Sequence, residues 1–85
     1  MDGRVRILFF STAREAVGRA SLARTVAAEG TRLGALVDAL GLEFPRLRPV
    51  MRASRWVVNG EYSSGRDALV RPGDEVAIHP PYSGG

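Results

Sequence analysis

The sequence has 85 residues, a hydrophobic fraction of 45%, a charged fraction of 25% and a formal net charge of +3. These values suit one small globular domain, and no run approaches the roughly 20 apolar residues of a membrane span. The absence of cysteine excludes disulfides, thiolate nucleophiles and cysteine-ligated zinc. All 12 basic residues are arginine, and they are scattered rather than gathered in the dense stripe typical of nucleic-acid binding. We expect a cytoplasmic protein that binds neither nucleic acid nor membrane.

A strand is predicted over residues 4–10, which are rich in branched and aromatic side chains. Because side chains alternate along a strand, Val5, Ile7 and Phe9 share one face, and Leu8 and Phe10 share the other. The first face is the candidate core face.

A short helix and a second strand are predicted next. Ser11 or Thr12 can cap the helix, and Gly18 can end it. The second strand is predicted over residues 21–27. Thr31 can then cap a longer helix.

The longer helix is indicated by one apolar stripe at helical spacing. Pro45 and Pro49 predict its end and the start of an irregular segment, in which Leu47, Val50 and Met51 pack against the core. The stripe consists of Leu33, Leu36, Val37 and Leu40.

A hairpin is the clearest local prediction, because Asn59-Gly60 separates the apolar run WVV from Glu61-Tyr62. A second turn is predicted over residues 72–74, followed by a strand that alternates from Glu75 to His79. Pro80 and Pro81 must end this strand, because proline cannot donate a ladder hydrogen bond.

The predicted order is strand, short helix, strand, long helix and three strands. It indicates an α+β fold, a roll in which a mixed sheet of four to five strands packs on one main helix. In the β-grasp version of this roll, the first and last strands pair in parallel at the centre. Here these are the most apolar strands, as central strands should be. A single domain over residues 1–85 is expected, with residues 80–85 as an extended tail.

Catalytic patterns are scarce. His79 is the single histidine, the carboxylates are scattered, and neither a nucleophile motif nor a glycine-rich phosphate loop occurs. We expect no metal site and no bound cofactor. The tail is the remaining candidate: two prolines hold a chain extended, and residues 83–85 (SGG) are small enough to enter a narrow channel.

Three stretches together carry a family resemblance: VRILFFSTAREAVG, VVNGEY and ALVRPGDEVAIHPPYSGG. They resemble the small subunits of molybdopterin synthase, the MoaD type, over nearly the whole chain. The thiamin sulfur carriers are similar in fold and tail but lack the opening FF-xxx-RE. The resemblance implies a ubiquitin-like β-grasp fold and a carrier that is not itself an enzyme.

The resemblance also implies a use for the tail. An adenylyltransferase of the ubiquitin-activating type uses ATP to adenylate the carboxylate of Gly85, and sulfur then replaces the adenylate, leaving a C-terminal thioglycine. Gly84 lets the tail thread into the large subunit of the synthase. There the sulfur passes to cyclic pyranopterin monophosphate and builds the molybdopterin dithiolene. The expected assembly with the large subunit is a 2:2 heterotetramer.

Partner-binding residues are also implied. Phe10, Tyr62 and His79 occupy positions at which the family grips the large subunit with apolar side chains. His79 departs from this pattern, and Tyr82 is larger than the residue usual at its place. The remaining implied contacts are Pro80, Pro81 and Ser83 of the tail.

Two other classes of function are compatible with these residues. A ubiquitin-like modifier joined to other proteins would use the same activated Gly84-Gly85 end. A plain interaction module with an inert tail would tolerate its loss.

Overall fold

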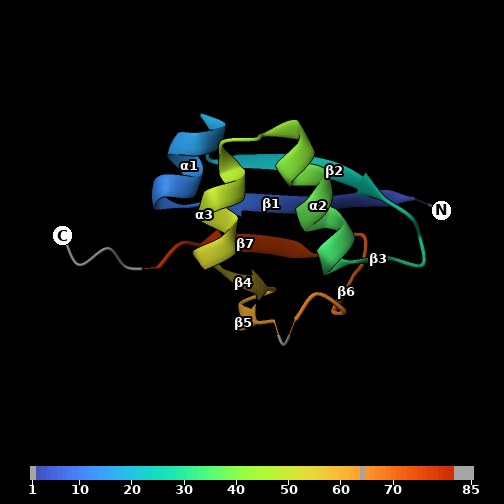
Figure 1. Ribbon diagram of the computed structural model, residues 1–85. Helices are drawn as coiled ribbons and strands as arrows, with labels where there is room; N and C mark the ends of the chain where they lie inside the picture. The colour runs from blue at the N-terminus through green and yellow to red at the C-terminus, as the bar shows by residue number, and fades with distance from the viewer. Residues whose placement is uncertain (1, 64, 82–85) are drawn as a thin grey trace.

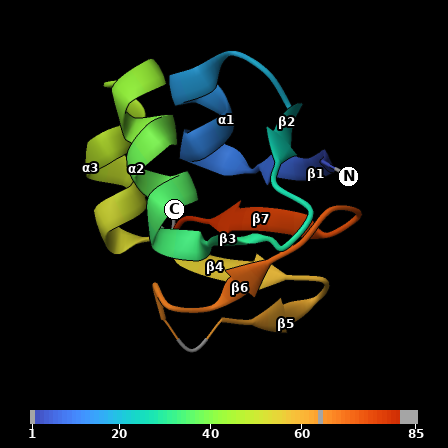
Figure 2. The ribbon, with the colours of Figure 1, turned by 90° about the vertical axis from the view of Figure 1, so that its right-hand side faces the viewer.

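The computed structural model describes residues 2–63 and 65–81. One mixed sheet has the strand order β2-β1-β7-β4-β5, and the helices lie over one of its faces (Figures 1 and 2). A separate antiparallel pair joins β3 to β6. In chain order the described elements are β1 (Gly3–Phe9), α1 (Ser11–Val17), β2 (Ser21–Val26), β3 (Thr31–Arg32), α2 (Leu33–Glu43), α3 (Leu47–Ala53), β4 (Arg55–Val58), β5 (Glu61–Tyr62), β6 (Leu69–Val70) and β7 (Glu75–His79).

The first and last strands pair in parallel at the centre of the sheet, as predicted. Ile7 lies opposite Val76, and Phe9 lies opposite Ile78. All four side chains are at most 2% exposed. The most apolar strands therefore occupy the centre of the sheet, where each has a neighbouring strand on both edges. The α+β roll is confirmed, with α3 packed against the main helix α2 and α1 packed against α3.

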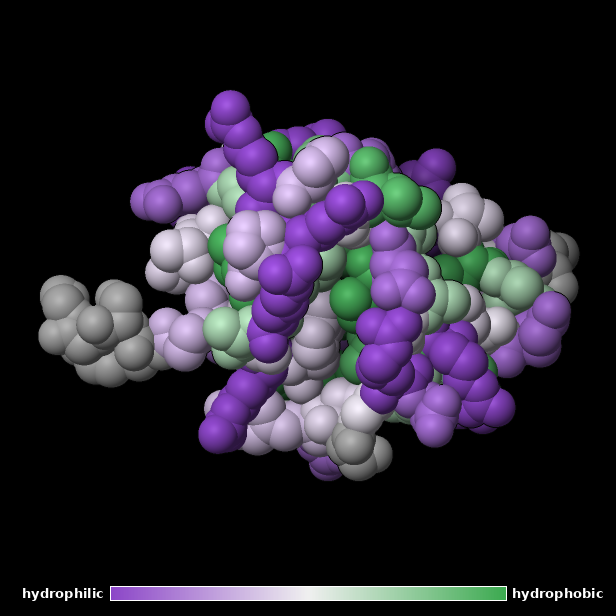
Figure 3. Space-filling model, viewed as in Figure 1, coloured by the Kyte–Doolittle hydropathy of each residue, from purple (hydrophilic) through white to green (hydrophobic). Residues whose placement is uncertain are grey.

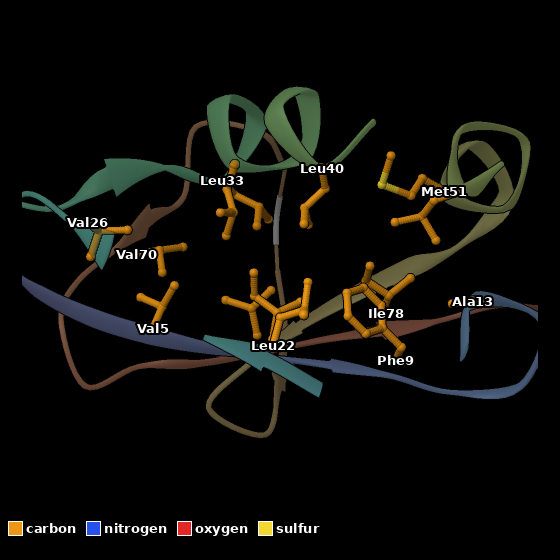
Figure 4. Packing of buried hydrophobic residues seen from close by; sticks show 14 residues of the cluster. Val5, Phe9, Ala13, Leu22, Val26, Leu33, Leu40, Met51, Val70 and Ile78 are labelled. Atoms are coloured by element: carbon orange, nitrogen blue, oxygen red, sulfur yellow. The ribbon is translucent and has the colours of Figure 1, made fainter. Parts of the chain in front are cut away.

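The core lies between the sheet and the helices. Figure 4 shows Val5 and Phe9 of β1 directed toward the side on which Leu33 and Leu40 of α2 lie. Each of these side chains is at most 2% exposed, so each contributes about 1.5–3 kcal/mol of burial free energy. The predicted core face of the first strand is confirmed.

The predicted side-chain caps are wrong for both helices. The N-cap of α1 is Phe10, while Ser11 already belongs to the helix and has a φ of 52°. The N-cap of α2 is Arg32, and neither helix has a side-chain cap hydrogen bond. Thr31 is instead in β3, paired with Val70. The predicted end of α1 is confirmed, since Gly18 is left-handed at φ 81° and its N–H donates to Arg14 O at 2.7 Å.

The segment expected to be irregular contains the helix α3. Pro49 is its third residue, within the first turn, where backbone N–H groups have no acceptor inside the helix. Proline is therefore tolerated there. The expected packing residues are confirmed: Leu47 and Met51 are buried and Val50 is half-buried.

The predicted hairpin between β4 and β5 is confirmed. Asn59 and Gly60 have φ values of 51° and 84°, the pair of positive values that a type I′ turn needs. The turn before β7 is also present, with Gly73 at φ 92°. The small sheet of β3 and β6 was not predicted, because two-residue strands show no period.

Candidate docking face and tail

The sheet face opposite the helices carries an apolar row that crosses four strands. Leu8 lies opposite Ala77, Ala77 opposite Val57, and Val57 opposite Tyr62. Leu8 and Val57 are half-buried, Ala77 is only 6% exposed, and Tyr62 is 67% exposed. Ala77, which alternation places on this outer face, therefore offers little contact surface. Tyr62, on the edge strand, offers the most.

Phe10 and His79 meet at one end of this face. Their ring centroids are 4.9 Å apart and the ring planes are inclined by 35°. Phe10 directly follows β1 and is 43% exposed, while His79 ends β7 and is also exposed. The exposure of Phe10 shows that its side chain is not part of the core. The two rings form an exposed aromatic surface.

Arg55 connects this aromatic pair to Tyr62. It lies opposite His79 in the β4–β7 ladder, and its Cζ is 5.3 Å from the centroid of the Tyr62 ring. This distance is within the range of a cation–π contact. We call the four residues Phe10, His79, Arg55 and Tyr62 the docking strip. Sequence reasoning missed Arg55, because only the strand register brings it beside His79.

The tail leaves the sheet at the docking strip. Strand pairing ends at His79, and Pro80 and Pro81 follow as half-buried and exposed residues without secondary structure. The predicted end of the last strand is confirmed. The candidate residues Tyr82, Ser83, Gly84 and Gly85 lie outside the described residues.

Asp74 has a structural role, remote from the docking strip. The pKa of Asp74 is lowered, because the Arg71 backbone N–H and the Asn59 side chain donate hydrogen bonds to its carboxylate. Asp74 precedes β7, at the end of that strand remote from His79. Among residues 2–63 and 65–81, no three His, Cys, Asp or Glu side chains are grouped to hold a metal ion. No helix in these ranges is long and apolar enough to cross a membrane.

Comparison with known proteins assigns nearly the whole chain to one family. The sequence profile of the ThiS family matches residues 7–85. The chain belongs to the ThiS family. This ThiS-family chain is 33% identical over 82 residues to the molybdopterin synthase sulfur carrier subunit of Mycobacterium tuberculosis, covering 96% of the chain and 98% of that protein. It is 37% identical over 81 residues to the subunit of the same name from Arabidopsis thaliana, covering 95% of the chain and 82% of that protein.

A solved structure of the same fold is that of SAMP1, small archaeal modifier protein 1, from Haloferax volcanii. The TM-score is 0.83 at 26% identity, over 98% of this ThiS-family chain and 100% of SAMP1. The ubiquitin-like β-grasp fold is therefore confirmed. The resemblance to the small subunits of molybdopterin synthase is also confirmed, by relatives that carry this name.

Proposed function

We propose that this chain is the sulfur carrier subunit of a molybdopterin synthase. Two curated relatives with this name match it over nearly its whole length. The observation that carries the proposal is the docking strip beside the exit of the tail, because one contact surface can then bind a partner and direct the tail into it. The proposed partner is the large subunit of the synthase, in a 2:2 heterotetramer.

The proposed chemistry takes place on Gly85. A carboxylate is a poor electrophile, so an adenylyltransferase of the ubiquitin-activating type first converts it to the acyl adenylate, with release of pyrophosphate from ATP. Hydrosulfide then displaces AMP and leaves a thiocarboxylate. The sulfur is a soft nucleophile, and docking presents it to cyclic pyranopterin monophosphate at high effective concentration. Hydrolysis after transfer returns the carboxylate of Gly85.

The tail residues have supporting roles in this proposal. Pro80 and Pro81 stiffen the chain as it leaves the sheet, which lowers the entropy lost when the tail enters the partner. Tyr82 and Ser83 contact the entrance of the partner's channel. Gly84 passes its narrowest part, since glycine has no Cβ.

The decisive experiment is the intact mass of the chain after incubation with the adenylyltransferase, ATP and a sulfide source. We expect a gain equal to sulfur replacing oxygen, which is lost when product forms in the presence of the large subunit. Deletion of Gly85 should abolish the gain and leave the thermal midpoint unchanged, because the core lies within residues 2–81. Product formation by the Gly85 deletion would refute the proposal.

A protein modifier is the second candidate, favoured by the structural likeness to SAMP1. Activation would be the same, but a lysine amine of another protein would displace AMP and form an amide. Intact mass distinguishes the two: conjugates of higher mass, in place of the thiocarboxylate, would support the modifier. The thiamin-type carrier differs only in its acceptor, so formation of molybdopterin with the large subunit separates that alternative.

A further inference from the structure

A groove lies at the edge of the helix layer and shares Arg55 and Tyr62 with the docking strip. It has a volume of about 900 Å³ and runs between α2, α3 and the β4–β5 hairpin. Figure 3 shows an apolar hollow on this face between long hydrophilic side chains. Its apolar lining includes Leu33, Val37, Leu42, Met51 and Trp56.

The lining contains apolar surface that no described part of the chain covers. Leu42 is 74% exposed, the highest value among the large apolar residues of the described chain. Trp56 and Val37 are half-buried and pack against the core. Removing such side chains from water is favourable, so a partner that covers them gains binding free energy.

The rim of the groove is basic. Arg48, Arg52, Arg55 and Arg66 line it, against the single carboxylate of Asp38. Asp38 is already paired with Arg66 at 2.8 Å. None of the other three arginines forms a salt bridge within the described residues. The unpaired positive charge is therefore concentrated along one wall of the groove.

The unpaired arginines follow the chain in a row. Arg48 and Arg52 are one turn apart on α3, a rise of about 6 Å, and Arg55 begins β4 directly beyond. The Arg48 Nε donates to Gly41 O at 2.9 Å, which directs this side chain across from α3 to α2. A single small anion would contact one of these groups. A chain that carries several carboxylates could contact all of them.

We propose that this groove binds an acidic amphipathic segment of a partner protein. Apolar side chains of the segment cover Leu42 and Trp56, and its carboxylates pair with Arg48, Arg52 and Arg55. The volume accommodates several side chains, and the open shape suits a segment that lies along the surface. This binding requires neither Gly85 nor Phe10, although Arg55 and Tyr62 of the docking strip also line the groove.

The test uses Trp56, the only tryptophan of the chain, as a fluorescent reporter. The full chain is titrated with an amphipathic peptide of repeated Glu-Glu-Leu-Leu units and with the matched peptide in which every Glu is Gln. We expect a saturable change in Trp56 emission with the acidic peptide, and about tenfold weaker binding of the amide peptide. A higher salt concentration should weaken binding of the acidic peptide but not of the amide peptide, because salt screens exposed charge pairs.

Matched variants locate the site. Arg52→Glu should lower the affinity for the acidic peptide by about tenfold, since the substitution replaces an attraction with a repulsion. Arg4→Glu makes the same charge change on the opposite face of the sheet and should leave the affinity within about twofold. Leu42→Ser removes apolar contact without changing charge and should weaken both peptides. The thermal midpoints of the three variants confirm that each is folded.

Several outcomes would overturn the inference. These are the absence of a saturable signal, equal binding of both peptides, or an equal loss with Arg4→Glu and Arg52→Glu. A Trp56 signal that changes with protein concentration alone would make a second copy of this chain the occupant. Tighter binding of an oligouridylate at the same arginines would make it a nucleic acid. A loss of sulfur transfer on deletion of Gly85, with peptide binding intact, would leave this inference standing.

Discussion

Phe10 is exposed because of its place in the chain. It follows the last residue of β1 and acts as the N-cap of α1, where its carbonyl accepts hydrogen bonds from the N–H groups of Ala13 and Arg14 at 3.0 and 3.4 Å. Its backbone is still extended, with φ −119° and ψ 151°, so the alternation that turns Phe9 into the core turns Phe10 to the opposite face. Its ring instead contacts His79 on the sheet face away from the helices. This apolar ring can contact a partner without removing any side chain from the core.

We predict that Phe10→Arg weakens binding of the large subunit by at least about tenfold, since exposed aromatic residues at interface centres commonly contribute more than 1 kcal/mol. Isothermal calorimetry with the purified large subunit measures this change. Leu42→Arg is the control, because it makes a similar change on the helix side and should keep the wild-type affinity. Unchanged affinity with Phe10→Arg would disprove the role of the docking strip.

Two turns are joined at the opposite end of the sheet, and this junction sets the position of β4. The Asn59 side chain donates to Asp74 Oδ1 and accepts from the Glu75 N–H, both at 2.9 Å. The Arg71 N–H donates to Asp74 Oδ2 at 2.8 Å. The hairpin turn is thereby attached to the turn that precedes β7. It helps to hold the ladder in which Arg55 lies beside His79.

We predict that Asp74→Asn lowers the free energy of unfolding at neutral pH by about 1 kcal/mol, a small value because the carboxylate is largely solvated. The lowered pKa of Asp74 means that the folded state binds its proton less readily than the unfolded state does, whose pKa is near 3.8. Its contribution is therefore present above pH 3.8 and is lost as the pH falls through the lower folded value.

Urea unfolding at neutral pH and at a pH well below 3.8 tests this prediction. The difference between wild type and Asp74→Asn should be present at the first pH and absent at the second. Asp67→Asn, at an exposed position before β6, should change neither value by more than about 0.5 kcal/mol. A difference between wild type and Asp74→Asn that is unchanged at low pH would show that the charge of Asp74 is not responsible.

In the whole molecule, the residues that stabilise the fold and those proposed to bind partners lie in different layers. The described residues contain no buried polar or charged side chain, and one apolar cluster fills the space between sheet and helices. The docking strip lies mainly on the far face of the sheet, and the basic groove lies at the edge of the helix layer. Substitutions in either surface should therefore affect partners without unfolding the chain.

Leu40 and Leu42 allow a direct test of this separation within one helix. Leu40 is 1% exposed and Leu42 is 74% exposed. We predict that Leu40→Ala lowers the free energy of unfolding by about 2–5 kcal/mol, a large part of the 5–15 kcal/mol typical of a domain. Leu42→Ala should change it by less than about 0.5 kcal/mol. Equal losses in chemical denaturation would contradict the layer assignment.

Local sequence patterns were sufficient to predict the elements whose side chains alternate and the turn that needs positive φ values. The alternation of Val5, Ile7 and Phe9 predicted the core face, and the positive φ values of Asn59 and Gly60 explain why that dipeptide predicted the hairpin. Local patterns did not predict α3, because Pro49 indicated a break in helical structure. They also predicted the wrong N-cap residues for α1 and α2. At Thr31, pairing with Val70 from a distant part of the chain replaced the capping role.

The sequence alone was enough to predict the β-grasp fold class, the candidate binding residues Phe10, Tyr62 and His79, and the family. These predictions depend on residue types and on their spacing along one chain. Only the tertiary structure could reveal the docking strip with Arg55 and the basic groove. Both surfaces combine residues from separate strands and helices. Their spacing is set by strand register and helix packing, and a shift of register by one residue would turn Arg55 to the other face.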